Sequence, residues 1–589
     1  MFLYSKLFGS SILTRRPAKP GFGKTVLCSR VIDQLGEFAS GAQVADAGLS
    51  PCVVYYFFDK QSDFHGPEDA IRALLSQLFH LQRQNQSIVT TMKSKKDNSQ
   101  VGQTWASNKE ILDILCEVFL SATTENSTII FVLDALDECS DPSAFLELLR
   151  KFEPISTCAF FISCRPTIVF PRALCHDGNT IRPDSAVNTP DIERFAFKEV
   201  GDLVDDGFLF CEDVPDEPRR RQVFVAELAA KISSRADSMF LWVKVLCDYL
   251  RSPPLTLRQR LDAITNLNQL EGMDALYMAI IRSLQTQFQG STESTITRLF
   301  RLVSQAKRPL RIQELSVALT VPLERPWTPL DSIPSFERNL GPMSGALMET
   351  NLEGDVKFIH ASTLEFFRRR TQGFCSTSSD AIVGACLAYL DLTVPPEPFG
   401  KPQQPPTEAS TRVHQRYPFL AYCCRYWSLH LLDWFEEFGK AEQLPSAQEP
   451  IPVLLRSFVY NPRKITAWIE ASWLFSFAPQ VCLDITTFLS GSQSISTSLD
   501  WKAKILEDLN ALREDLTNLN QDWGYILLKE PYEIWEPSIP AFSQSRFWVK
   551  PFESNVNPVG DSGQNSITIQ SKLSTSGLEI GIIKLFPSR

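Results

Sequence analysis

Residues 18–25 read AKPGFGKT, and their types and spacing suit the binding of a phosphate group. The complete phosphate-loop pattern is Gly, four residues of any kind, and then Gly-Lys-Thr or Gly-Lys-Ser. Gly23, Lys24 and Thr25 fill the last three positions, while Ala18 occupies the position of the first glycine. The sequence therefore predicts a phosphate-binding loop with one departure. The alternative is a Gly-Lys-Thr turn in an ordinary loop.

Each residue of this loop would have a definite task. Gly21 and Gly23 can adopt a positive φ without steric strain, so the backbone N–H groups of the loop can surround a phosphate. Lys24 would reach the β- and γ-phosphates, and the hydroxyl of Thr25 would bind Mg²⁺. Residues 25–35 carry apolar side chains at helical spacing, which places the loop at a helix N-terminus, where the macrodipole favours an anion.

The segment that should enter the loop as a buried strand is weak. Only residues 12–14 have strand character, because the Arg-Arg-Pro of residues 15–17 interrupts the apolar run. We therefore expect an incomplete first strand, and a chain truncated at its N-terminus would explain it.

A second group of candidate residues follows a predicted strand within residues 127–139, STIIFVLDALDEC. Residues 129–133 form an unbroken apolar run, as expected for a strand buried on both faces, and Asp134 lies at its C-terminal end. An Asp there can hold the Mg²⁺ that bridges the β- and γ-phosphates, while Asp137 or Glu138 could orient or deprotonate the attacking water. The alternative is a strand that ends in a solvated acidic turn.

Alternating strand and helix signals surround the two motifs and predict a parallel sheet covered by helices. We expect strands over residues 52–59 and 158–164, and helices over residues 67–82, 108–122 and 142–152. Arg165 follows the last of these strands, where it could contact a γ-phosphate. The alternative is an arginine that is solvated at the strand end.

The stretches KPGFGKT, YYFFD, IIFVLDALDEC and FFISCRP together resemble the NACHT-type NTPase of fungal signal-transduction ATPases, also described as nephrocystin-type N-terminal NTPases. Residues 305–319 and 356–367 resemble the winged-helix part of these STAND-class, NLR-like proteins. The resemblance covers roughly residues 17–550. It implies an α/β P-loop NTPase, a parallel sheet covered by helices, followed by mainly α-helical domains that include a winged helix.

The resemblance also implies ligands and partners. These are ATP or GTP with Mg²⁺ as cofactors, and other proteins or further copies of the chain as partners. In related switch NTPases, a histidine matching His360 touches the β-phosphate of a bound diphosphate and holds the closed state; the acid that usually follows it is replaced here by Ala361. The alternative for His360 is a core histidine bonded to a backbone carbonyl.

The pattern along the chain divides it into six regions. We expect a NACHT-type NTPase domain over 1–175, a helical domain over 176–270, a winged-helix-like domain over 271–375, a helix and an exposed Pro-rich linker over 376–412, a C-terminal helical region over 413–550, and a β-hairpin-like tail over 551–589. In the C-terminal region, apolar residues between 505 and 519 follow 4-3-4-3 spacing, which over two heptads indicates an amphipathic helix rather than a coiled coil.

Composition excludes several classes of protein. The 589 residues carry 58 basic and 68 acidic side chains, a net charge of −10, and no long basic run, so nucleic acid is not an expected partner. No run of about 18 apolar residues predicts a membrane span. The 14 cysteines show no zinc-ligand spacing and lie in apolar runs, which indicates buried thiols and a cytoplasmic location.

Two functions are consistent with these features. The first is a nucleotide-dependent switch that binds and slowly hydrolyses ATP or GTP to control self-assembly or signalling. The second is a nucleotide-independent interaction scaffold that retains a degenerate NTPase fold, favoured by Ala18 and by the weak first strand.

Overall fold

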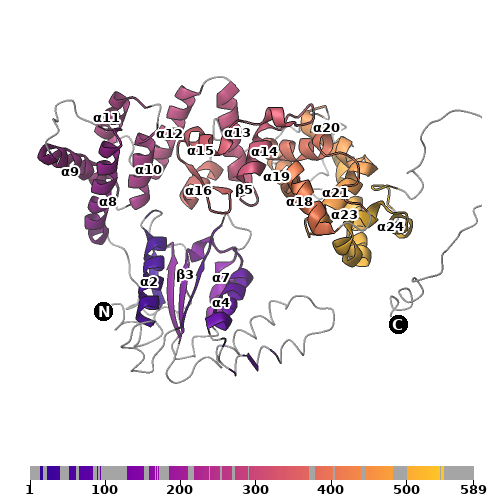
Figure 1. Cartoon of the computed structure of the whole chain (residues 1–589), viewed down its shortest axis with the longest axis horizontal. Helices are drawn as coiled ribbons and strands as arrows, with labels where there is room; N and C mark the ends of the chain where they lie inside the picture. The colour runs from indigo at the N-terminus through magenta and orange to yellow at the C-terminus, as the bar shows by residue number, and fades with distance from the viewer. Residues whose placement is uncertain are drawn as a thin grey trace, which may run out of the picture.

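The computed structural model describes a sheet-containing part and a longer helical part (Figure 1). The residues that it describes are 13–17, 21, 23–39, 52–60, 65–81, 83, 86, 89–90, 93, 129–150, 158–165, 168, 170, 185–209, 218–237, 239–252, 255–267, 272–288, 291–369, 379–401, 405–439, 446, 448–481, 500–543 and 545–549. In Figure 1 the sheet lies below an elongated row of helices.

The sheet has four parallel strands in the order β1-β4-β3-β2. The strands are β1 (Leu13–Pro17), β2 (Cys52–Phe57), β3 (Ile129–Asp134) and β4 (Cys158–Cys164). The parallel arrangement confirms the α/β prediction. The expected break after residue 14 is wrong, because β1 continues to Pro17 opposite Cys164. Among the described strands β1 pairs on one side only, and an edge position tolerates the missing N–H of a proline.

Helices cover both faces of the sheet, because alternate side chains of its central strands point to opposite sides. All residues of β3 and β4 are buried. On one face α2 (Lys24–Ala39) packs on Ile130 and Val132; on the other, α4 (Pro67–Leu81) and α7 (Pro142–Leu149) pack on Phe131 and Leu133. The strand residues thus alternate between two cores, as expected for a doubly covered sheet. The helix predicted over 108–122 lies outside the described residues.

The helical part begins after the sheet and has three consecutive groups of elements. The first comprises α8 (Ser185–Asp205), α9 (Pro218–Arg235), α10 (Phe240–Leu250), α11 (Leu257–Thr265) and α12 (Met273–Gln287). The second comprises α13 (Ser291–Gln305), β5 (Leu310–Arg311), α14 (Ile312–Thr320), α15 (Phe336–Ser344), β6 (Met348–Thr350), β7 (Asp355–Phe358) and α16 (Ala361–Arg369). The third comprises α17 (Asp380–Ala388), α18 (Pro406–Arg416), α19 (Leu420–Gly439), α20 (Pro450–Val459), α21 (Pro462–Leu474), α23 (Asp500–Lys529) and α24 (Ser538–Phe542).

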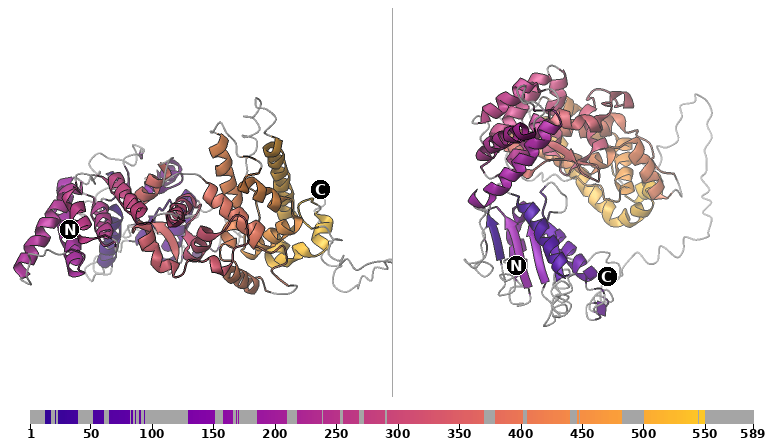
Figure 2. Two further views of the ribbon diagram at one scale, coloured as in Figure 1. Left: turned by 90° about the horizontal axis from the view of Figure 1, so that it is seen from above. Right: turned by 60° about the vertical axis from the view of Figure 1, so that its left-hand side comes forward.

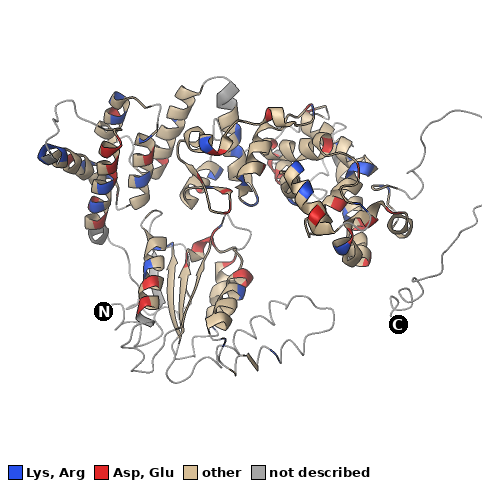
Figure 3. Ribbon diagram, in the orientation of Figure 1, with Lys and Arg blue, Asp and Glu red and all other residues tan. Residues whose placement is uncertain are grey.

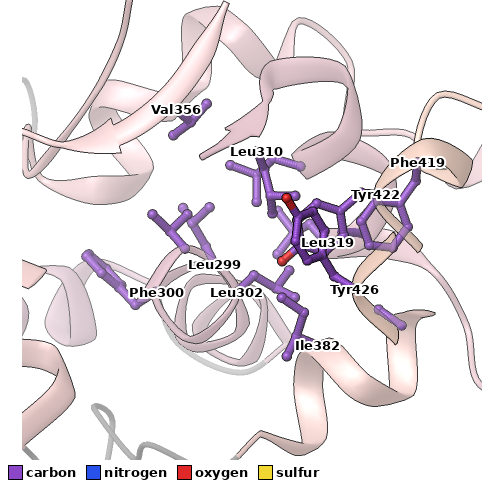
Figure 4. Close-up of a cluster of buried hydrophobic side chains, with 14 of the residues drawn as sticks. Leu299, Phe300, Leu302, Leu310, Leu319, Val356, Ile382, Phe419, Tyr422 and Tyr426 are labelled. Atoms are coloured by element: carbon purple, nitrogen blue, oxygen red, sulfur yellow. The ribbon is translucent and has the colours of Figure 1, made fainter. Parts of the chain in front are cut away.

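One continuous hydrophobic core joins these three groups. The buried residues that belong to it run from Ile192 in α8 to Trp548 near the C-terminus. Figure 4 shows a part of this core where Leu302 of α13 lies beside Ile382 of α17, with Tyr422 of α19 nearby. Seen from above in Figure 2, the helical part is elongated, from the purple helices at one end to the yellow helices at the other. The division of this part at residues 270, 375 and 412 stays a prediction.

The Pro-rich segment is packed in part: of its described residues, Val394, Phe399 and Ala409 are buried, where the sequence predicted an exposed linker. Phe399 is buried, and the backbone N–H groups of Phe399 and Gly400 donate to the carboxylate of Glu470 over 2.9 and 2.7 Å. Pro406 then begins α18, where a proline is tolerated because the first N–H of a helix needs no intrahelical acceptor. Two backbone hydrogen bonds to a buried carboxylate thus hold the segment at Phe399 and Gly400.

The C-terminal amphipathic helix is observed as α23, and the predicted apolar positions on it are all buried: Ile505, Leu509, Leu512, Leu516 and Leu519. The predicted β-hairpin of residues 551–589 lies outside the described residues. Among the helices that the structure describes, none is long and apolar enough to cross a bilayer.

Candidate functional site

The predicted phosphate loop leads directly into α2, which begins at Lys24. Gly21 and Gly23 adopt φ values of +80° and +76°, as glycine allows, and the N–H of Leu27 donates to the carbonyl of Gly23 over 3.0 Å. Ala18 lies outside the described residues. The described glycines therefore have the backbone that the loop requires, at the N-terminus of a helix.

The loop also contacts the helical part. The N–H of Leu241 in α10 donates to the carbonyl of Gly21 over 3.3 Å. A Cβ atom placed on Gly21 would lie 2.7 Å from the Cβ of Leu241, closer than side chains approach one another, and one on Gly23 would lie 3.5 Å from the ring of Phe240. The first turn of α10 therefore covers the loop, and glycine is required at Gly21 both by its φ and by this close approach.

Asp134 lies at the C-terminal end of β3 and is 2% exposed. Its Oδ1 accepts hydrogen bonds from the hydroxyl of Ser163 on β4 and from the thiol of Cys28 on α2, the latter over 3.2 Å. Among the described residues, none donates to Oδ2. The carboxylate is thus fixed through one oxygen, while the other keeps its lone pairs for a metal-bound water or an ion. Carboxylate oxygens are the ligands that Mg²⁺ prefers, so Asp134 fits the predicted metal site.

Both carboxylate oxygens of Asp137 bind Arg165. A short 3₁₀ helix, η1 (Leu136–Glu138), turns the chain after Ala135, which has a φ of 53°. This turn directs Asp137 toward the end of β4, where its Oδ1 accepts the backbone N–H of Arg165 over 2.8 Å and its Oδ2 pairs with Nε of Arg165 over 2.9 Å. With both oxygens occupied, Asp137 positions Arg165 and is a poor candidate for proton abstraction.

Glu138 is a largely buried carboxyl group with a raised pKa. Its carboxylate accepts the backbone N–H of Lys60 over 3.2 Å. Burial raises the pKa of Glu138 to about 7, and the charges of Asp137 and Asp59 add to this rise against the opposing effects of the Lys60 N–H and Arg165. A carboxyl group with a pKa near 7 can both accept and return a proton at neutral pH. The sequence left open whether Asp137 or Glu138 acts on the attacking water. In the structure the two differ, because Asp137 binds Arg165 whereas Glu138 has a raised pKa.

Lys24 lies among these charges. Burial lowers its pKa, and so does the nearby charge of Arg165, while Asp137 and Asp134 oppose the shift. Thr25, next to it, is exposed in the first turn of α2. Figure 3 shows the acidic residues at the end of the sheet that faces the helical part. Lys24, Asp134, Asp137 and Arg165 are therefore brought together at the C-terminal ends of the parallel strands, where ligands of such sheets bind.

His360 reaches the same site from the helical part. It lies between β7 and α16, and its Nδ1 accepts the backbone N–H of Ser362 over 3.0 Å. Burial lowers the pKa of His360 to about 4, helped by the charges of Arg165 and Lys24. The ring is therefore neutral at pH 7 with its proton on Nε2. The alternative was a histidine bonded to a backbone carbonyl. Among the described residues, the observed partner of the ring is instead Ser362, which bonds to Nδ1.

A chain of hydroxyl groups supports the ring. Nδ1 lies 2.9 Å from the hydroxyl of Ser362, which lies 3.0 Å from the hydroxyl of Tyr277 on α12, and Thr363 donates to that same hydroxyl over 2.9 Å. Among the described residues, none hydrogen-bonds to Nε2. The ring is thus fixed by its Nδ1 side, and its remaining N–H can donate to an anion.

Two ion pairs join the sheet part to the helical part near these residues. Nη1 of Arg165 lies 2.8 and 3.0 Å from the two carboxylate oxygens of Glu365 on α16. Lys357 on β7 pairs with Asp59, which follows β2. Glu365 and Asp59 could not be identified from the sequence, because an acid on an amphipathic helix or after a strand has no local signal that distinguishes it from a solvated one.

The parallel sheet, the glycine loop before α2 and the acidic end of β3 define the class of a P-loop NTPase. Residues 9–165 match the family model described as "Nephrocystin 3, N-terminal". Over 352 residues the chain is 21% identical to the "Vegetative incompatibility protein HET-E-1" of Podospora anserina. These two matches support a relationship of residues 9–165 to the nephrocystin-type N-terminal domains and of the chain to a NACHT-type protein.

The coverage of these matches differs. The match to the Podospora protein covers 59% of this chain and 24% of that protein, so the chain spans about a quarter of its relative's length. A solved structure, the ORC2 protein of Aeropyrum pernix in ADPNP–ADP complexes, is similar at 14% identity with a TM-score of 0.25, and the match covers 62% of this chain and 88% of that one.

Proposed function

We propose that this chain is a nucleotide-dependent molecular switch, which binds ATP or GTP with Mg²⁺, hydrolyses it slowly and thereby controls self-association or signalling. The main support is the position of His360. This residue directly precedes α16, whose Glu365 pairs with Arg165 of the sheet part over 2.8 Å, and its pKa is lowered by burial and by the charges of Arg165 and Lys24. One phosphate group could therefore contact both parts of the chain at once.

In this proposal each residue of the site contacts a different part of the bound nucleotide. The loop from Gly21 to Thr25 surrounds the β- and γ-phosphates, with Lys24 as its charged donor. Asp134 and Thr25 would hold Mg²⁺, which would neutralise part of the phosphate charge when bound. Glu138 accepts the proton of the attacking water, and Arg165, held by Asp137, donates to the γ-phosphate.

His360 acts on the diphosphate-bound state. Its Nε2–H donates to a β-phosphate oxygen, which holds the helical part against the sheet. We assign α13 to α16 with the antiparallel sheet β5-β7-β6 as the winged-helix unit that carries this histidine; the three-stranded sheet and the helices before and after it support the assignment. The nine cysteines of the described residues are all buried, which supports a cytoplasmic location.

Replacement of Lys24 by Ala tests the proposal. Loss of a charged hydrogen bond costs roughly 1.5–3 kcal/mol, so nucleotide affinity should fall about 10- to 100-fold in calorimetric titrations. Arg30→Ala is the matched control, because it removes a positive charge from an exposed position of the same helix. Equal nucleotide affinity of the Lys24→Ala and unaltered proteins would contradict the proposal.

A second function is favoured by one specific observation. Ala18 occupies the position where the phosphate-loop pattern has its first glycine. A chain that binds no nucleotide but keeps the fold would act as a protein-interaction scaffold. The same titrations decide between the two functions, since a scaffold shows no saturable binding of ATP, GTP or their diphosphates.

A further inference from the structure

Arg165 is shared between two carboxylates that come from different parts of the chain. Asp137 of η1 binds its backbone N–H and its Nε, while Glu365 of α16 binds its Nη1 through both carboxylate oxygens. A guanidinium presents five N–H groups along two edges. Asp137 therefore binds Nε, and Glu365 binds Nη1, one of the two terminal nitrogens through which Arg165 could contact a phosphate.

The two carboxylates are not equivalent partners. The side chain of Asp137 is 8% exposed and holds Arg165 by two contacts to different atoms, one of them in the backbone. The side chain of Glu365 is 32% exposed and contacts only Nη1. Glu365 is therefore the partner that can leave while Arg165 keeps its orientation.

We infer that Glu365 competes with the terminal phosphate of a nucleoside triphosphate for Arg165, so that this interdomain ion pair makes the site prefer diphosphate to triphosphate. The inference rests on the proposed function and adds the residue that regulates it. A γ-phosphate bound to Nη1 of Arg165 would meet the negative charge of Glu365 at the same nitrogen. A diphosphate has no such group and leaves the pair intact.

Displacement of Glu365 would also loosen the contact between the two parts. α16 begins directly after His360, and Glu365 is its anchor on the end of β4. Among the described residues near the site, the ion pair of Lys357 with Asp59 would then still join the two parts. Binding of triphosphate would therefore favour separation of α16 from the sheet, whereas diphosphate would retain the contact.

Calorimetric titration of Glu365→Gln with both nucleotides tests the inference. The expected result is a rise in triphosphate affinity of roughly 5- to 50-fold with little change in diphosphate affinity. This size is typical when two binding events, here those of Glu365 and of the γ-phosphate at Arg165, oppose each other. Lys357→Gln is the matched control, because it removes the other ion pair between the same two parts without touching Arg165. It should leave the ratio of the two affinities unchanged.

Two further variants and a readout without nucleotide complete the experiment. In an Arg165→Ala background, Glu365→Gln should no longer change the ratio of affinities. Hydrogen exchange of the nucleotide-free protein should show that Glu365→Gln and Arg165→Ala lower the protection of residues 361–369 to the same extent.

The outcomes separate the inference from the proposed function. A ratio that stays unchanged in Glu365→Gln, or that changes equally in Lys357→Gln, would overturn the inference while leaving the switch intact. Unaltered protein that binds no nucleotide would reject the proposed function, and with it any role of Glu365 in choosing a nucleotide. Unchanged protection of residues 361–369 in Glu365→Gln would show that the pair does not anchor α16.

Discussion

Nδ1 of His360 accepts a hydrogen bond from the backbone N–H of Ser362 over 3.0 Å, and this single contact fixes which ring nitrogen carries the proton. Burial, Arg165 and Lys24 together keep the pKa of the ring at about 4, so His360 stays neutral across the physiological range. An N–H on Nε2 is thus available to a phosphate without the cost of titrating the ring.

His360→Ala should weaken diphosphate binding more than triphosphate binding, because it removes a donor to the β-phosphate in the closed state. A hydrogen bond to a charged group contributes about 1.5–3 kcal/mol, which shifts a two-state equilibrium by one or two decades. Calorimetry gives the two affinities, and sedimentation of the same samples should show a larger fraction of assemblies. An unchanged affinity ratio together with an unchanged size distribution would leave His360 as a packing residue.

Glu138→Gln should slow hydrolysis by about 100-fold or more while nucleotide binding stays intact, as expected for loss of a general base. Asp134→Ala should instead weaken Mg²⁺-dependent binding, because it removes the carboxylate that Ser163 and Cys28 hold in place. Phosphate release and titration with and without Mg²⁺ distinguish the two phenotypes. Hydrolysis at the original rate by Glu138→Gln would remove Glu138 from the mechanism.

The rate of hydrolysis should depend on pH through Glu138. A base works in its deprotonated form, and burial sets the pKa of this group to about 7, so kcat/KM should rise from pH 6 to pH 8 and level off above that. The Glu138→Gln variant should show no rise over this range. A profile that is flat for the unaltered protein, or that falls with pH, would contradict the assignment of a base.

Gly21→Ala should disrupt the contact between the phosphate loop and α10. The new Cβ would lie 2.7 Å from that of Leu241, on a backbone whose φ of +80° already disfavours alanine. Nucleotide affinity should fall at least tenfold, the effect of about 1.4 kcal/mol. Gly36→Ala is the control in α2, because a Cβ there meets no atom within 4 Å and should stabilise the helix by about 0.5–1 kcal/mol.

Glu470→Ala should destabilise the helical part and release the Pro-rich segment. Its buried carboxylate accepts the N–H groups of Phe399, Gly400 and the Trp535 indole, and unsatisfied buried donors cost about 1–3 kcal/mol each. Denaturant titration should show a loss of roughly 3 kcal/mol or more. The exposed Glu408→Ala on α18 should stay within about 0.5 kcal/mol of the unaltered protein. Equal stability of both variants would contradict this role of Glu470.

The sheet part was largely predictable, because its signals are local. The apolar runs of β3 and β4 and the glycines before α2 lie next to one another in sequence, and each predicts its own element. The break expected within residues 15–17 was wrong for a reason that is not local, since an edge position decides whether a proline can remain in a strand. Position in the sheet is a property of the whole fold.

The contacts between the two parts could not be predicted from the sequence. Arg165 and Glu365 are 200 residues apart, and Lys357 and Asp59 are 298 apart, so no spacing rule connects them. Likewise the packing of Phe399 depends on Glu470, an acid whose burial no local pattern reveals. The sequence indicated which residues could do chemistry, while the partners that fix their roles required the fold.

The continuous core from Ile192 to Trp548 has a mechanical consequence for any motion that starts at the nucleotide. Helices that share one close-packed interior cannot slide independently without opening cavities. A rotation of α16 on the sheet would therefore turn the whole helical row, and its elongated form would act as a lever arm. The far end at α23 and α24, where Tyr525 and Phe542 are exposed, would then travel the greatest distance and present its surface in a new direction.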